Sequence, residues 1–181
     1  MVPVSAPEAV CIAELIESLP EKRRNSVTCR FARAVETLRR EGILDRIGAV
    51  GSNQLSNEES RKVLQRYFEL DIACPFLEDE ACSIYSCRPS RCREYIVTSP
   101  AHHCANPFEQ KISRLPVSVR LSEVFSRAWA ALTHSRPILI PLVCAVKWVA
   151  ANEDARYCAV NDPGRFIEVI AGFIGRPKPS R

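Results

Sequence analysis

The chain has 181 residues, of which 46% are hydrophobic and 25% are charged. This balance is typical of a globular protein and excludes a disordered or fibrous chain, while the length suits one core rather than two. The net charge of +4 is too small to indicate a nucleic-acid partner. Residues 1–9 lack a secretory signal, and no apolar run reaches the roughly 20 residues that cross a bilayer. We therefore expect a cytoplasmic protein without a membrane partner.

Apolar side chains recur at helical spacing in six segments. They predict helices at about residues 7–19, 21–41, 56–71, 119–132, 141–151 and 162–174. Pro20 ends the first helix, Gly42 caps the second, and Ser56 with Glu59 forms a capping box for the third. Residues 48–57 are polar and contain glycine, which indicates a loop. We expect a mainly α fold, with one helical domain at 1–175 and a flexible basic tail at 176–181.

Residues 72–107 differ from the rest because they show no regular apolar periodicity and contain five of the nine cysteines. These are Cys74, Cys82, Cys87, Cys92 and Cys104. In a reducing compartment, clustered cysteines indicate metal binding or catalysis rather than disulfides. A segment that cannot bury itself through a regular pattern needs another organiser, and a metal supplies one. We therefore expect a helical domain around an irregular cysteine-rich metal-binding loop at 72–107.

Thiolates are soft ligands, which favours zinc or an iron–sulfur cluster over oxygen-loving ions. Four thiolates complete a zinc tetrahedron or anchor a cubane cluster. The spacing has neither the two close pairs of a zinc ribbon nor a ferredoxin-type run, so the metal remains open. His102 and His103 are reserve ligands. The arginines in Cys87-Arg88-Pro89-Ser90-Arg91-Cys92-Arg93 either favour thiolates or form a solvated edge of the loop.

Several short motifs of this segment resemble those of a known family. They are Cys74-Pro75-Phe76-Leu77, Cys82-Ser83-Ile84-Tyr85, Arg88-Pro89 and Cys92-Arg93-Glu94-Tyr95, followed by Cys104. Over about residues 72–104 the chain resembles the YkgJ-type cysteine-cluster family, which is described as chelating zinc or iron. The resemblance implies that the metal ligands are Cys74, Cys82, Cys92 and Cys104, and that Arg88 and Pro89 shape the turn. It also implies that Cys87 is a spare thiol, a resolving thiol or an alternative ligand.

The chain departs from the family at its N-terminal side. Relatives usually have a closely spaced cysteine group there, whereas this chain has only Cys11 and Cys29. Cys29 lies opposite the apolar stripe of its predicted helix, so we expect it outside the core, where it could reach the metal loop. We expect Cys11, Cys144 and Cys158 to act as small hydrophobes of apolar helical segments.

Three functions are compatible with this sequence. The metal could organise a structural module that binds a protein partner, or an iron–sulfur cluster could serve a redox or iron-handling role. The third function is S-adenosylmethionine-dependent protein lysine N-methylation, because the family core is similar to the cysteine region of flagellin lysine N-methylase. The sequence shows no glycine-rich loop that would hold this cofactor, so we rank the enzyme as the alternative.

Overall fold

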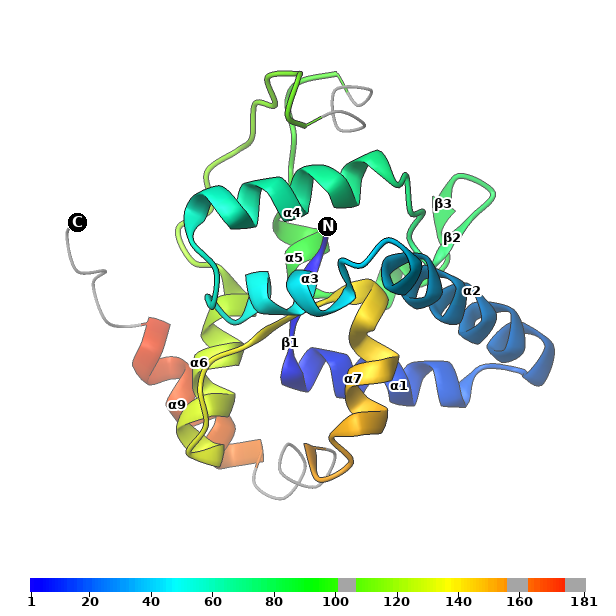
Figure 1. The fold of residues 1–181 in the computed structure, drawn as a ribbon. Helices are drawn as coiled ribbons and strands as arrows, with labels where there is room; N and C mark the ends of the chain where they lie inside the picture. The colour runs from blue at the N-terminus through cyan, green and yellow to red at the C-terminus, as the bar shows by residue number, and fades with distance from the viewer. Residues whose placement is uncertain (101–106, 156–162, 175–181) are drawn as a thin grey trace.

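The computed structural model describes residues 1–100, 107–155 and 163–174, and the predicted mainly helical fold is confirmed (Figure 1). The main helices are α1 (Ala6–Ser18), α2 (Glu21–Arg40), α3 (Leu44–Gly51), α4 (Asn57–Glu69), α6 (Leu121–Thr133), α7 (Ala145–Ala151) and α9 (Pro163–Ile174). Short elements lie between α4 and α6, namely β2 (Leu77–Glu78), β3 (Ala81–Cys82), the 3-10 turn η1 (Tyr85–Cys87) and α5 (Ser90–Glu94). Within the described residues 72–100, the cysteine-rich segment therefore contains only these short elements.

A short sheet joins the N-terminal end of the chain to residues far along it. Strands β1 (Pro3–Ser5) and β4 (Leu139–Pro141) pair antiparallel, with Val4 opposite Ile140. Both of these side chains are buried. The chain then passes through the 3-10 turn η3 (Leu142–Cys144) into α7, which packs against α1. Because α1 follows β1 directly in the chain, this sheet also fixes the position of α1.

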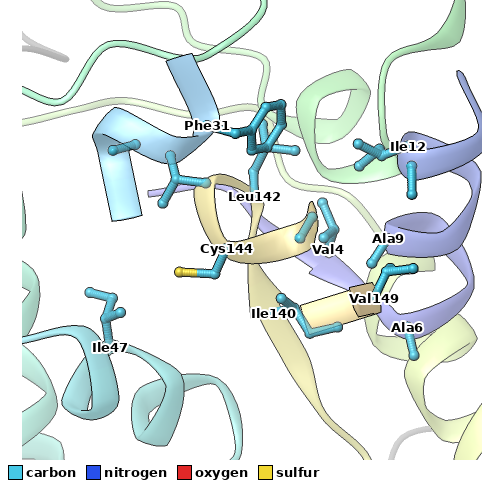
Figure 2. Close-up of a cluster of buried hydrophobic side chains, with 14 of the residues drawn as sticks. Val4, Ala6, Ala9, Ile12, Phe31, Ile47, Ile140, Leu142, Cys144 and Val149 are labelled. Carbon is cyan, nitrogen blue, oxygen red and sulfur yellow. The ribbon is translucent and has the colours of Figure 1, made fainter. Parts of the chain in front are cut away.

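The apolar core lies where α1, α2, α7 and the β1–β4 sheet meet (Figure 2). Its labelled members are Val4, Ala6, Ala9, Ile12, Phe31, Ile47, Ile140, Leu142, Cys144 and Val149. Leu142 reaches the side of Phe31, and Cys144 is 8% exposed within this cluster. This core therefore anchors α1 and α2, and Phe31 of α2 also contacts Phe76 of the cysteine segment within it.

The structure contains the helix caps from which two of the helix boundaries were predicted. Gly42 has a φ of 67° after α2, a left-handed conformation that glycine adopts without steric cost. At the start of α4, the Ser56 hydroxyl accepts a hydrogen bond from Glu59 N at 3.3 Å. The Glu59 carboxylate accepts hydrogen bonds from the Ser56 hydroxyl at 2.7 Å and from Ser56 N at 3.0 Å, and these two bonds lower the pKa of Glu59. The predicted capping box is confirmed.

The predicted loop at 48–57 is wrong at its beginning, because α3 extends to Gly51. Two contacts explain the difference. Ile47 is fully buried and anchors this helix in the core. Gly51 lies so close to β4 that a Cβ atom built on it would be 1.7 Å from the Leu139 carbonyl oxygen. The glycine serves close packing rather than a turn, and a local pattern cannot distinguish these two uses.

The C-terminal predictions are confirmed in outline. The buried helix predicted at 141–151 begins at Ala145, because Pro141 belongs to β4. Helix α9 packs on α6, where the rings of Phe125 and Phe166 are 6.2 Å apart. The apolar stripe of α9 is only partly covered, since Ile167 is 64% exposed. The predicted tail at 176–181 lies outside the described residues, and none of the helices in the described part could span a membrane.

The two glycines of α3 give a matched test of this packing. Gly51→Ala should lower the free energy of unfolding by about 1–3 kcal/mol, because the new methyl group meets the backbone of Leu139. Gly48→Ala should be neutral or should stabilise by up to about 1 kcal/mol, since nothing lies within 4 Å of its Cβ position. Urea denaturation measures both. Equal stability of the two variants would contradict the close approach of α3 and β4.

Candidate metal centre

Three of the four cysteines that the sequence predicts as ligands lie near one another. Cys74 follows α4, Cys82 ends β3, and Cys92 lies within α5. Burial, and after it the charges of the Cys74 and Cys82 thiols, raise the pKa of Cys92 to about 11. Cys74 is exposed as a residue, yet desolvation and the charge of Cys82 still raise the pKa of its thiol. The three thiols therefore lie in one region of the fold, close enough to influence one another's ionisation.

The first two thiols are positioned by one buried ring. Phe76 is 1% exposed, and its ring meets that of Phe31 on α2 edge to face at 5.4 Å. The residues around Phe76 form the turn that leads into the β2–β3 hairpin: Cys74 O accepts from Leu77 N at 2.9 Å, and Phe76 O accepts from Ser83 N at 2.8 Å. Burial of Phe76 therefore places Cys74 and Cys82 on the same side of α2.

Arginines of α2 hold the hairpin from the outside. Arg30 donates to Leu77 O at 2.9 Å and to the Glu78 carboxylate at 2.5 Å. Arg23 donates to Ser83 O at 2.8 Å and lies 3.6 Å from the Glu78 carboxylate. The hydrogen bond and charge of Arg30 lower the pKa of Glu78, so the carboxylate stays ionised near neutral pH. Sequence analysis missed this attachment because it joins residues about fifty positions apart.

The hairpin turn has an uncommon backbone. Asp79 and Glu80 have φ values of 47° and 59°, so both turn residues are left-handed. Two-residue hairpins favour this conformation because it matches the twist of the strands, and aspartate tolerates it, but a glutamate such as Glu80 adopts it at a steric cost. The bonds from Arg23 and Arg30 to the strands offset that cost. Bonds from α2 therefore add to the stability of the turn that precedes Cys82.

The structure answers the open question about the arginines around Cys92. Arg88 donates to Tyr85 O at 3.1 Å, and its guanidinium lies 3.7 Å from the centre of the Tyr85 ring. Arg93 donates to Arg88 O at 2.9 Å and to Ser86 O at 2.5 Å. Both side chains thus bond to backbone carbonyl groups within residues 85–88 and stabilise this turn. The charge of Arg88 also lowers the pKa of Cys92, which partly opposes the effect of burial.

The remaining cysteines occupy different surroundings. Cys29 is exposed on α2, as predicted, beside Arg33 and Asp79. Cys87 is exposed next to the Ser86 hydroxyl, at 3.7 Å. The expectation that Cys11 is a buried hydrophobe is wrong, because it lies on the outer face of α1. For Cys144 the expectation is confirmed.

Other predicted residues lie outside the described part of the chain, namely Cys104, Cys158, His102 and His103. Within 1–100, 107–155 and 163–174, no three His, Cys, Asp or Glu side chains already form an arrangement that could hold a metal. The thiols of Cys74, Cys82 and Cys92 are soft sulfur donors, and such donors suit both zinc and iron. The assignment of the four ligands stays a prediction.

A comparison with protein families now bears on this site. Residues 21–114, more than half of the chain, match the family CxxCxxCC, described as "Putative zinc- or iron-chelating domain". The chain belongs to this family. Membership supports metal binding as the general function and agrees with zinc or iron as the predicted cofactor. No curated protein and no solved structure showed significant similarity to the chain.

The chain differs from the pattern that the family name spells. That pattern has four closely spaced cysteines, the last two adjacent, whereas no two cysteines of this chain are adjacent or separated by two residues. Within the matched range, Cys29 is the one cysteine that precedes Cys74. The sulfur donors of the matched range are therefore concentrated between Cys74 and Cys104.

The hairpin attachment can be tested through metal affinity. Arg30→Met keeps the length of the side chain but removes the bonds to Leu77 O and Glu78, so metal affinity should fall about tenfold. Arg33→Met, on the exposed side of the same helix, is the control and should bind as tightly as wild type. Competition with a chromophoric chelator gives both affinities. Equal affinities would show that the hairpin keeps its place without Arg30.

The buried thiol of Cys144 gives a second test. Because burial raises its pKa to about 11, only about one in ten thousand of these groups is ionised at pH 7. Iodoacetamide should label the exposed Cys29 before Cys144 in the folded protein, and both at similar rates in denaturant. Peptide mapping by mass spectrometry measures the order. Equal labelling of the folded protein would place Cys144 outside the core.

Proposed function

We propose that this chain is a metal-binding module in which Cys74, Cys82, Cys92 and Cys104 hold one zinc ion or one iron–sulfur cluster. The concentration of cysteines in one irregular segment carries the proposal, and the mutual electrostatic influence of Cys74, Cys82 and Cys92 supports it. Membership of a family described as zinc- or iron-chelating supports it independently. Four thiolates are the ligand number that either centre requires.

The protein prepares this site through its own residues. Phe76 and the arginines of α2 fix the segment that carries Cys74 and Cys82. The positive charges of Arg30 and Arg88 favour ionised thiols at Cys74 and Cys92, respectively. A thiol with a raised pKa must lose its proton when it becomes a metal ligand, so these guanidinium groups lower the cost of binding.

The identity of the metal decides the role. A zinc centre would hold segment 72–107 in one conformation that a protein partner can recognise, which is a structural role. An iron–sulfur cluster would serve electron transfer or iron handling, with a potential that depends on the nearby charges. No observation in the described residues favours the alternative function, lysine N-methylation. Their strands form two-stranded antiparallel sheets rather than a parallel nucleotide-binding sheet.

Metal content of two cysteine variants tests the proposal. Wild-type protein purified without oxygen should carry about one zinc ion or about four irons per chain. Cys92→Ala should lose most of this metal because one of four ligands is gone, whereas Cys144→Ala, which removes a core thiol, should keep it. Elemental analysis measures both, and visible absorption distinguishes an iron–sulfur cluster from colourless zinc. Equal metal in the two variants would reject the ligand set.

A further inference from the structure

The carboxylate of Glu8 joins two parts of the chain that are distant in sequence. One oxygen accepts hydrogen bonds from Ser5 N at 2.8 Å and from the Ser5 hydroxyl at 2.7 Å. The other oxygen accepts from Ser90 N at 2.8 Å and from the Ser90 hydroxyl at 2.6 Å. Ser5 is fully buried and Ser90 is 9% exposed, so the donors of these bonds are shielded from water while Glu8 itself is half-buried. One side chain of α1 therefore satisfies four donors.

The four bonds exceed what Glu8 needs for its local role. Ser5 and Glu8 stand three residues apart, which is the spacing of a capping box at the start of α1. That motif uses one carboxylate oxygen, and the second is directed at Ser90, which is 82 residues away. The local spacing could have been found from the sequence, but the contact with Ser90 could not.

Ser90 is the first residue of α5, the short helix that carries Cys92. A helix of five residues cannot hold its conformation alone, because the cost of nucleation exceeds the gain from so few bonds. Contacts from other elements must fix it. At its other end, the Glu94 carboxylate accepts a hydrogen bond from Leu121 N at 2.6 Å, at the start of α6. Helix α5 is thus attached to α1 at its first residue and to α6 at its last.

We propose that Glu8 is a positioning residue of the metal centre, which fixes the position of α5, and with it Cys92, through Ser90. This inference rests on the proposed function and assigns to it a residue outside the matched range 21–114. The chain has no closely spaced cysteine group before Cys74. The positions of its few sulfur donors therefore depend on attachments such as the one between Glu8 and Ser90. The N-terminal helix is then a part of the metal site.

Glu8→Gln is the most direct variant because it keeps the size of the side chain. The amide replaces one oxygen with an NH₂ group, which would face the donors of Ser5 or Ser90 instead of accepting from them. Glu14→Gln removes an exposed carboxylate from the same helix and is the matched control. Ser90→Ala removes one of the four hydrogen bonds of Glu8. It replaces Glu8→Gln as the test variant if Glu8→Gln does not fold.

The experiment measures zinc affinity by chelator competition and the absorption spectrum of the cobalt(II)-substituted protein. Glu8→Gln should bind zinc about 10 to 100 times more weakly than wild type, and its thiolate-to-cobalt absorption should weaken as the Cys92 sulfur moves. Glu14→Gln should match wild type in both. The loss in the double variant Glu8→Gln/Ser90→Ala should be smaller than the product of the two single losses, because both changes act on one contact.

Three results would overturn the inference. They are wild-type zinc affinity in Glu8→Gln, a weaker affinity with an unchanged cobalt spectrum, and independent effects of Glu8→Gln and Ser90→Ala. The second result would show loss of stability without movement of the ligand. Cys92→Ala separates the two proposals: if it keeps full metal, the proposed ligand set fails. If it loses metal while Glu8→Gln behaves as wild type, the role of Glu8 alone fails.

Discussion

The edge-to-face contact of Phe76 with Phe31 determines where the cysteine segment lies on the helices. Most of residues 72–100 is too irregular to have a buried face of its own, and Phe76 is its largest fully buried side chain. A buried phenylalanine of this kind typically contributes about 3–5 kcal/mol relative to alanine, more than a surface ion pair supplies. The bonds from Arg23 and Arg30 then orient the hairpin that this anchor has placed.

The gathered thiols oppose their own ionisation. Burial and mutual repulsion raise the pKa of Cys92, while Arg88 acts in the opposite direction. Neutral thiols can therefore lie close together in the metal-free protein at little electrostatic cost. Binding of a cation reverses the balance, since the metal charge compensates the thiolates more strongly than any guanidinium group does.

Local features of the structure could be predicted from sequence, and distant contacts could not. Apolar periodicity located the helices, and Ser56 with Glu59 identified the start of α4, because caps depend on neighbouring residues. The density of cysteines indicated the segment that now contains the three gathered thiols. Gly51 was taken as a loop residue because its contact with Leu139 is long-range. Glu78 and Glu8 carry no signal for their partners, since each resembles an ordinary surface carboxylate until the chain is folded.

The central claim is that sulfur atoms from this segment share one metal, and X-ray absorption at the edge of the bound metal tests it most directly. For zinc-loaded protein, we expect a first shell of four sulfur atoms at about 2.3 Å. For an iron–sulfur cluster, the first shell should consist of sulfur, with further iron atoms as the next neighbours. A first shell dominated by nitrogen or oxygen would contradict the account, because the metal would then be bound by side chains other than these cysteines.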